Sequence, residues 1–211
     1  MSVWAVIVAA GQGARFGSLK QYERLEGRRV VDWSIDAARA ACDHVVLVVP
    51  EPHSGEPETS VDAVVAGGPT RSASVRAGLA AVPEDAELIV VHDAARPRAS
   101  PQLFRSVIDA VRAGADGAVP GLPVVDTIKR VDRQSQMVIE TPDRAALVAV
   151  QTPQAFRASI LRAAHRTGGE ATDDASLVER CGGRIVVVPG EAENRKVTDR
   201  HDLDVLSDLR R

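Results

Sequence analysis

The sequence predicts a three-layer α/β/α fold around a mostly parallel, twisted sheet, from which a β-hairpin arm protrudes. Short apolar runs rich in β-branched residues alternate with stretches of helical period. This alternation is typical of βαβ units with right-handed crossovers. Residues 120–150 break the rhythm, because polar and apolar residues alternate there around "DRQSQ", and such a pattern favours a hairpin.

Four apolar runs are bounded by turn residues and predict strands that are buried on both faces: 3–10, 44–50, 87–93 and 184–190. Helical periodicity predicts three intervening helices, over 30–41, 70–82 and 101–114. Pro101 suits a first helical turn after Ser100, and Gly114 suits a helix end. The hairpin arm, at about 121–148, is expected to need a partner to pack on, because an isolated pair of strands is only marginally stable.

Composition limits the class of protein. The chain has 211 residues, of which 45% are apolar and 26% charged, so we expect one globular domain over 1–211. With 26 basic and 29 acidic side chains the net charge is −3, which gives no indication of a nucleic-acid partner or an anionic membrane. No secretory leader or membrane-length apolar run is recognisable, and we expect a cytoplasmic protein.

The two cysteines, Cys42 and Cys181, lack the spacing of a metal site or of a redox pair. They are predicted to be buried free thiols in a reducing compartment.

The loop after the first strand, "AAGQGARFGSLKQ" (9–21), combines small residues with two cations, Arg15 and Lys20. It differs from a dinucleotide fingerprint, since Phe16 takes the place of the third glycine, and from a P-loop, since Gln21 follows the lysine. Small residues let backbone N–H groups approach an anion. Because parallel sheets bind ligands at the carboxyl ends of their strands, this loop favours phosphoryl or nucleotidyl transfer with charge supplied by the two cations.

Seven stretches occur together and in order: "AAGQGARFGSLKQ" (9–21), "GGPTRSASVRAGL" (67–79), "VVHDAARP" (90–97), "DTIKR" (126–130), "TPDRAALVAVQTPQAF" (141–156), "TDDASLVE" (172–179) and "RKVT" (195–198). The ordered set resembles the 2-C-methyl-D-erythritol 4-phosphate cytidylyltransferases of the non-mevalonate isoprenoid pathway, over nearly the whole chain. The resemblance implies a Rossmann-like nucleotidyltransferase fold, CTP and a sugar-alcohol phosphate as substrates, and a homodimer formed through the arm. It also implies Mg²⁺ held mainly by the CTP phosphates, with no protein metal ligand.

The resemblance assigns roles to single positions. The catalytic positions are Arg15 and Lys20, which match transition-state stabilisers on the phosphates, and Lys196, which matches the lysine that positions the attacking phosphate. The positions matched to CTP binding are Ala9, Ala10, Gly11, Gly13, Gly67, Gly68, Ser74 and Ala94. Those matched to the second substrate are Asp93, Arg96, Thr127, Arg144 and Thr152, with Arg144 reaching across a dimer interface.

Other readings stay open from the sequence. Leu19 stands where the family has a proline, and the stretch from Arg15 to Lys20 is shorter than in the family. The alternatives are a cytidylyltransferase for ribitol 5-phosphate or another polyol phosphate, and a CTP-binding sensor without turnover; the absent third glycine disfavours a dehydrogenase. His92 is expected to be structural, and "TDDAS" is expected to be a helix cap at Thr172 rather than a metal site.

Overall fold

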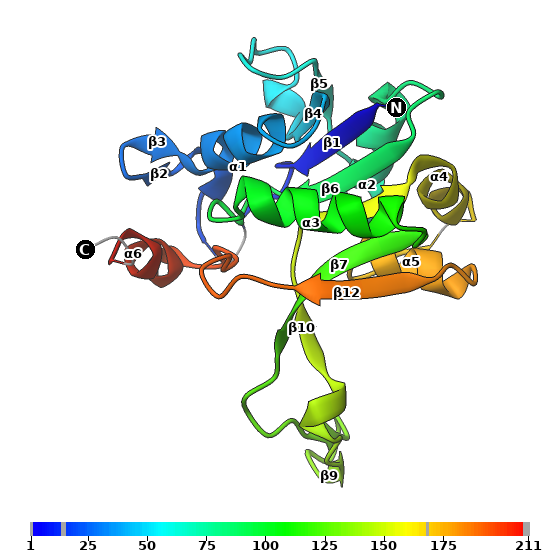
Figure 1. The fold of residues 1–211 in the computed structure, drawn as a ribbon. Helices are drawn as coiled ribbons and strands as arrows, with labels where there is room; N and C mark the ends of the chain where they lie inside the picture. Colours follow the sequence, from blue (N-terminus) through cyan, green and yellow to red (C-terminus); the bar gives the residue numbers. More distant parts are fainter. Residues whose placement is uncertain (1, 14–15, 168, 209–211) are drawn as a thin grey trace.

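An eight-stranded sheet runs through the molecule in the order β10-β7-β11-β6-β1-β4-β5, with β12 paired to β7 (Figure 1). The computed structural model describes residues 2–13, 16–167 and 169–208. The strands of this sheet are β1 (Val3–Val8), β4 (His44–Val49), β5 (Ala63–Ala66), β6 (Leu88–Asp93), β7 (Gly117–Pro123), β10 (Val148–Val150), β11 (Gln154–Arg157) and β12 (Ile185–Pro189).

Most neighbours in the sheet are parallel, as predicted. β1 pairs in parallel with β4 on one side and β6 on the other, β4 with β5, and β12 with β7. The exceptions are β11, which is antiparallel to β6 and to β7, and β10, which is antiparallel to β7. The chain therefore leaves the sheet through β7 and returns through β10 and β11, close to where it left.

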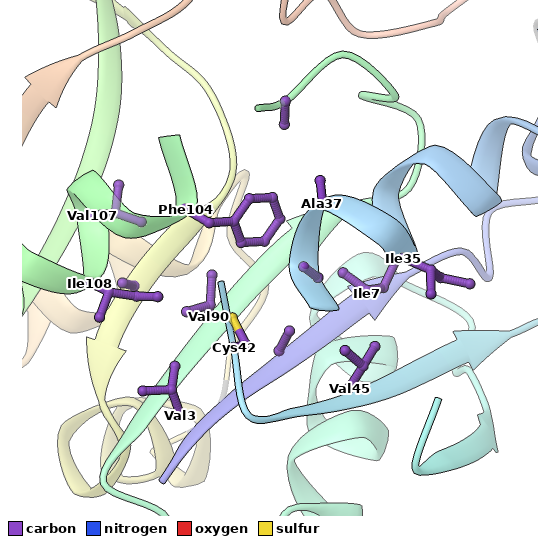
Figure 2. Packing of buried hydrophobic residues seen from close by; sticks show 14 of the residues in the cluster. Val3, Ile7, Ile35, Ala37, Cys42, Val45, Val90, Phe104, Val107 and Ile108 are labelled. Carbon is purple, nitrogen blue, oxygen red and sulfur yellow. The ribbon is translucent and has the colours of Figure 1, made fainter. Parts of the chain in front are cut away.

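Five helices cover the two faces of the sheet: α1 (Val30–Arg39), α2 (Arg71–Ala81), α3 (Pro101–Arg112), α4 (Ala158–Arg166) and α5 (Asp174–Arg180). A further helix of the described chain, α6 (Arg200–Asp208), belongs to a separate cluster. One buried cluster joins the sheet to α1 and α3, and Figure 2 shows Phe104 of α3 between Val107, Val90 of β6 and Ala37 of α1. A second cluster on the other face joins the sheet to α2, α4 and α5. These two clusters confirm the three predicted layers.

Local sequence explains where the predicted helices begin. The Thr70 hydroxyl accepts a hydrogen bond from the Ala73 N–H and starts α2, and the Ser100 hydroxyl does the same for Leu103 in α3. Pro101 occupies the first turn of α3, as expected, and Gly114 follows its end at φ +114°, a conformation that favours glycine.

Three expectations are wrong. β12 is an edge strand, in which the Val187 side chain is 52% exposed, because β12 pairs only with β7 and its outer edge is uncovered. Cys181 is exposed, since it directly follows the end of α5, while Cys42 is buried as predicted. The cap of α5 is Asp173, whose carboxylate accepts from the Ser176 N–H, rather than Thr172.

The segment between β7 and β10 forms the predicted hairpin arm, with β8 (Arg130–Val131) antiparallel to β9 (Val138–Glu140). In Figure 1 it extends away from the sheet. A smaller hairpin, β2 (Arg24–Leu25) and β3 (Arg28–Arg29), precedes α1, and 3-10 turns occur at η1 (Lys20–Tyr22), η2 (Glu51–His53) and η3 (Arg144–Ala146). Within the described ranges no helix is long and apolar enough to cross a membrane.

Candidate active site

A pocket of about 460 Å³ opens where β1 and β6 end, at the edge where a parallel sheet binds ligands. Nine of the residues singled out from the sequence line it: Ala9, Ala10, Gly11, Lys20, Gly68, Ser74, Asp93, Ala94 and Lys196. They come from the loop after β1, the start of α2, the end of β6 and the loop after β12. The structure therefore gathers one site from widely separated parts of the sequence.

The two predicted lysines meet at this pocket. The Lys196 ammonium lies 2.6 Å from Oδ2 of Asp93, and the Lys20 ammonium donates a 2.7 Å hydrogen bond to the carbonyl of Val197, the residue after Lys196. Arg15 lies outside the described residues. The loop that carries Lys20 is thus joined directly to the loop that carries Lys196.

Arg71, at the start of α2, is a pocket residue that the sequence reasoning missed. Its Nε donates to Oδ1 of Asp93 at 3.0 Å, and its NH1 lies 2.9 Å from Oδ2 of the buried Asp174. Burial alone would lower the pKa of Arg71, but Asp174 and Asp93 raise it above its ordinary value. The sequence did contain a signal for such a contact. A cation in the first turn of a helix interacts unfavourably with the helix dipole, and a carboxylate partner offsets this cost.

Two cations, Arg71 and Lys196, keep the side chain of Asp93 ionised. Burial alone would raise its pKa, but Arg71 and Lys196 hold the pKa of Asp93 well below its usual range. Behind Arg71, the other oxygen of Asp174 lies 2.9 Å from Nε2 of the buried His165. A row of alternating charges therefore runs from Lys196 at the pocket mouth into the layer formed by α4 and α5.

His92 is buried next to the pocket residue Asp93 and is held by hydrogen bonds on both ring nitrogens. Its Nε2 lies 3.2 Å from the carbonyl oxygen of Arg96 and its Nδ1 lies 3.1 Å from the hydroxyl of Thr152. A carbonyl only accepts, so the ring proton sits on Nε2 and Nδ1 accepts from Thr152. The same hydroxyl accepts from the Asp93 N–H at 3.0 Å. Burial lowers the pKa of His92 to about 4, which keeps the ring neutral at physiological pH.

Two predicted substrate residues, Arg96 and Thr152, do not line the pocket. Arg96 donates to the carbonyl of Asn194 at 2.8 Å, and the Asn194 side chain donates to the carbonyl of Thr152 at 2.8 Å. Both residues therefore brace the chain segment that leads to Lys196.

Two glycines near the site are needed because other atoms of the chain approach their backbone too closely for a side chain to fit. A Cβ on Gly67 would lie 2.2 Å from Cβ of Ala10 and 2.9 Å from Oγ of Ser74. Gly13 has φ +63°, and a Cβ there would lie 2.0 Å from the carbonyl oxygen of Ser18. Neither glycine lines the pocket; Gly13 shapes the loop after β1 and Gly67 lets the ends of β1 and β5 approach α2.

The family described as "IspD: 2-C-methyl-D-erythritol 4-phosphate cytidylyltransferase" has a model that matches residues 3–208 of the chain. The chain belongs to this family. A relative from Nocardia farcinica with that same enzyme name is 44% identical over 217 residues, covering 99% of the chain and 94% of the relative. A "Bifunctional enzyme IspD/IspF" from Clavibacter michiganensis is 44% identical over 213 residues, and there the match covers 94% of the chain but 52% of the relative.

Solved structures of cytidylyltransferases in this family share the fold. The 2-C-methyl-D-erythritol 4-phosphate cytidylyltransferase of Thermus thermophilus superposes with a TM-score of 0.83 at 36% identity, covering 99% of the chain and 98% of that protein. The 4-diphosphocytidyl-2C-methyl-D-erythritol synthase of Anaerococcus prevotii gives 0.85 at 29% identity, over 100% and 99%. The predicted family and fold class are confirmed, and the other polyol-phosphate and sensor readings are not favoured.

The two predicted substrate residues of the arm lie away from the pocket. Thr127 and Arg144 are exposed on the arm, and Arg144 donates to the carbonyl of Val125 at 2.7 Å. The structure therefore does not bring these two residues to the site of their own chain.

The divalent ion expected for this family would find few protein ligands. Among the described residues there is no group of three or more His, Cys, Asp or Glu side chains that could hold a metal. Asp93, the carboxylate that lines the pocket, already has both oxygens paired with cations.

Proposed function

We propose that the chain joins CTP and 2-C-methyl-D-erythritol 4-phosphate to give 4-diphosphocytidyl-2-C-methyl-D-erythritol and pyrophosphate. The observation that carries the proposal is the convergence of Lys20 and Lys196 on one pocket beside the small-residue loop after β1. Such a pocket presents backbone N–H groups and fixed cations to a polyphosphate. The family's description names 2-C-methyl-D-erythritol 4-phosphate and the transfer of a cytidylyl group, which supports this pair of substrates.

The reaction needs charge and position more than proton transfer. The phosphate oxygen of the sugar alcohol is already ionised at neutral pH and attacks the α-phosphorus of CTP in line, while pyrophosphate leaves. Negative charge grows on the phosphate oxygens in the transition state. We assign its stabilisation to Arg15 and Lys20, and we assign the positioning of the attacking phosphate to Lys196, which Asp93 orients at 2.6 Å.

The nucleotide base is assigned to the turn before α2. Gly67 and Gly68 lie in close contact with Ala10, Ala73 and Ser74. Ser74 Oγ accepts from the Gly68 N–H at 3.2 Å and donates to the Thr70 carbonyl at 2.9 Å, which fixes the turn. We expect this tight cradle to accept a pyrimidine and to exclude a purine.

We assign Mg²⁺ to the CTP phosphates, with waters completing its coordination. When bound, the ion neutralises phosphate charge. The chain's own contribution is assigned to Arg15, the two lysines and the backbone of residues 9–11. A cytoplasmic location remains a prediction from the sequence.

We also propose that the arm makes a homodimer. Its exposed apolar side chains include Val125 at 78%, Met137 at 69%, Val138 at 56% and Ile139 at 52% exposure. Monomers rarely expose such a group of residues, and the two short strands of the arm have little else to pack on. In a dimer, the guanidinium of Arg144 is assigned to the sugar phosphate of the partner's site, because a planar fork matches a phosphate well.

The reaction is tested by pyrophosphate release from CTP with Mg²⁺, with 2-C-methyl-D-erythritol 4-phosphate and ribitol 5-phosphate offered separately. Release with the first substrate alone is expected. Release with the second alone would replace the proposal by the polyol-phosphate alternative, and CTP binding without release from either would favour a sensor.

The dimer is tested by sedimentation velocity. Wild-type protein is expected to sediment as a dimer, and Ile139→Lys should sediment as a monomer at the same concentration. Asp109→Lys, an exposed charge reversal on α3, is the control and should leave the dimer intact. A monomeric wild-type protein would contradict the assignment.

A further inference from the structure

A third hydrophobic cluster, separate from the two that cover the sheet, lies beneath the two lysine loops. Its buried members are Phe16, Leu25, Val30, Val197 and Leu206, with Trp33 and Leu203 packed against it. Phe16 belongs to the loop that leads to Lys20, Val197 directly follows Lys196, and Leu206 lies on α6. Figure 1 shows α6 beside the β2–β3 hairpin, away from the helices that cover the sheet.

Val197 is the junction of this cluster with the pocket. Its side chain is fully buried in the cluster, its N–H donates to the carbonyl of Ala95 at 2.7 Å, and its own carbonyl accepts from the Lys20 ammonium at 2.7 Å. Ala95 and Lys20 both line the pocket. Any shift of Val197 therefore moves the anchor of Lys20 and the backbone next to Lys196 together.

Helix α6 is fastened to the rest of this cluster by polar contacts at both ends. At its start, the Asp202 carboxylate accepts from the Thr198 N–H at 2.7 Å and from the Asp199 N–H at 3.1 Å. Near its end, Arg98 donates to the carbonyl of Leu206 at 3.0 Å and also pairs with Glu26 at the tip of the β2–β3 hairpin. Leu206, whose side chain is fully buried and whose carbonyl is the second of these attachments, holds the helix against the loops.

We propose that Leu206 is a positioning residue for the transfer reaction: through Val197 it sets the separation of the Lys20 and Lys196 ammonium groups. The inference rests on the proposed function, in which both ammonium groups act on phosphates. Leu206 itself does not line the pocket. Its effect on catalysis is indirect and arises because charge stabilisation requires preorganised groups, so that a displacement of about 1 Å can cost about 100-fold in rate.

The test compares Leu206→Ala with Leu161→Ala, since Leu161 is an equally buried leucine on α4 in the second cluster. Leu206→Ala is expected to lower kcat for pyrophosphate release by about tenfold or more, with a smaller change in KM for CTP. Leu161→Ala is expected to keep kcat within about twofold, and Leu206→Met, which conserves volume, should restore most of the lost rate. Leu206→Val, a smaller truncation, gives a milder defect of the same kind if Leu206→Ala does not fold.

Hydrogen exchange read by mass spectrometry separates this inference from the proposed function. Leu206→Ala should speed exchange in both the 16–25 and 195–199 segments, and Leu161→Ala should leave both at the wild-type rate. Equal kcat losses in the two alanine variants, or unchanged exchange in either loop segment of Leu206→Ala, would overturn the inference. Absence of turnover in the wild-type protein would overturn the proposed function, and the exchange comparison would still decide whether Leu206 couples the loops.

Discussion

Arg71 shows how neighbouring carboxylates stabilise a partly buried charge. Two carboxylates, Asp93 and Asp174, lie within 3.0 Å of its guanidinium nitrogens. Removing one partner of a buried pair usually costs far more than the pair itself contributes, because the remaining charge stays desolvated. Asp174 is 1% exposed, so its substitution cannot be compensated by water.

We therefore expect Asp174→Asn to lower the free energy of unfolding by about 3 kcal/mol and to raise KM for CTP, because Arg71 would turn toward Asp93. Urea unfolding and steady-state kinetics measure the two effects. The control is Asp109→Asn, which weakens an exposed pair with Arg112 and should change stability by less than about 1 kcal/mol. Equal destabilisation by both variants would contradict the expectation.

We expect the buried His92 side chain to make the protein less stable in mild acid. Its folded pKa is lowered to about 4 from an ordinary 6.5, so between these values the unfolded chain binds a proton that the folded chain does not. Stability therefore falls as pH drops from about 6.5 to about 4, by about 3 kcal/mol in total from this group. Urea unfolding between pH 7 and pH 4.5 measures this fall, and His92→Gln should flatten it; parallel curves for the two proteins would argue against it.

The sequence predicted side chains that face the pocket better than those that support it. Lys20, Asp93 and Lys196 could be named because they follow strands at the ligand edge or match family motifs. Arg71 and Asp174 were not recognised as partners because they lie on α2 and α5, whose contact depends on the packing of the second cluster. No local pattern encodes a pairing between such distant segments.

Gly67 lies where β1, β5 and α2 converge, and it allows a prediction about close packing. A Cβ there would meet Ala10 at 2.2 Å and Ser74 at 2.9 Å, so Gly67→Ala must push α2 away from the loop after β1. We expect KM for CTP to rise about tenfold or more and stability to fall by about 1–3 kcal/mol, as for other overpacked sites.

The matched control for that change is Gly55→Ala, where an added Cβ meets nothing within 4 Å. It should leave both kinetics and thermal stability at wild-type values. If Gly67→Ala were equally silent, α2 would have to be free to move, and the assignment of the nucleotide base to this turn would fail.

Strands and helices with strong periodicity were predictable, while the sheet's order was not. The runs that became β1, β4 and β6 are continuous and β-branched, as central parallel strands require. β12 carries the same kind of sequence, yet its one partner is β7 and it lies at an edge. The crossover connections decide which strands lie next to each other in a sheet. Two strands of similar sequence can therefore differ in how deeply they are buried.

A shared active site would make the dimer visible in mixing experiments. If the arm of one subunit serves the partner's pocket, a heterodimer of Arg144→Ala and Lys196→Ala contains one intact site and one site with both defects. Random assembly of the two co-expressed variants makes about half of the dimers heterodimers, so about a quarter of wild-type activity should return.

The control is a mixture of Lys20→Ala with Lys196→Ala. Both changes lie in the body of the chain, so no arrangement of arms produces an intact site and no activity should return. Recovery in the control, or none in the Arg144→Ala mixture, would mean that Arg144 does not act across the interface.

The attachment of the arm decides which changes of length the protein can tolerate. The arm leaves at Pro123 and returns at Val148, two residues that pair with each other across β7 and β10, and four residues later Thr152 bonds to the Asp93 N–H. Residues added in the turn between β8 and β9 lengthen the arm without reaching the pocket. One residue added between Val148 and Thr152 reverses the faces of the returning strand and withdraws the Thr152 hydroxyl from His92. We therefore expect insertions to be tolerated at the tip of the arm and not at its base.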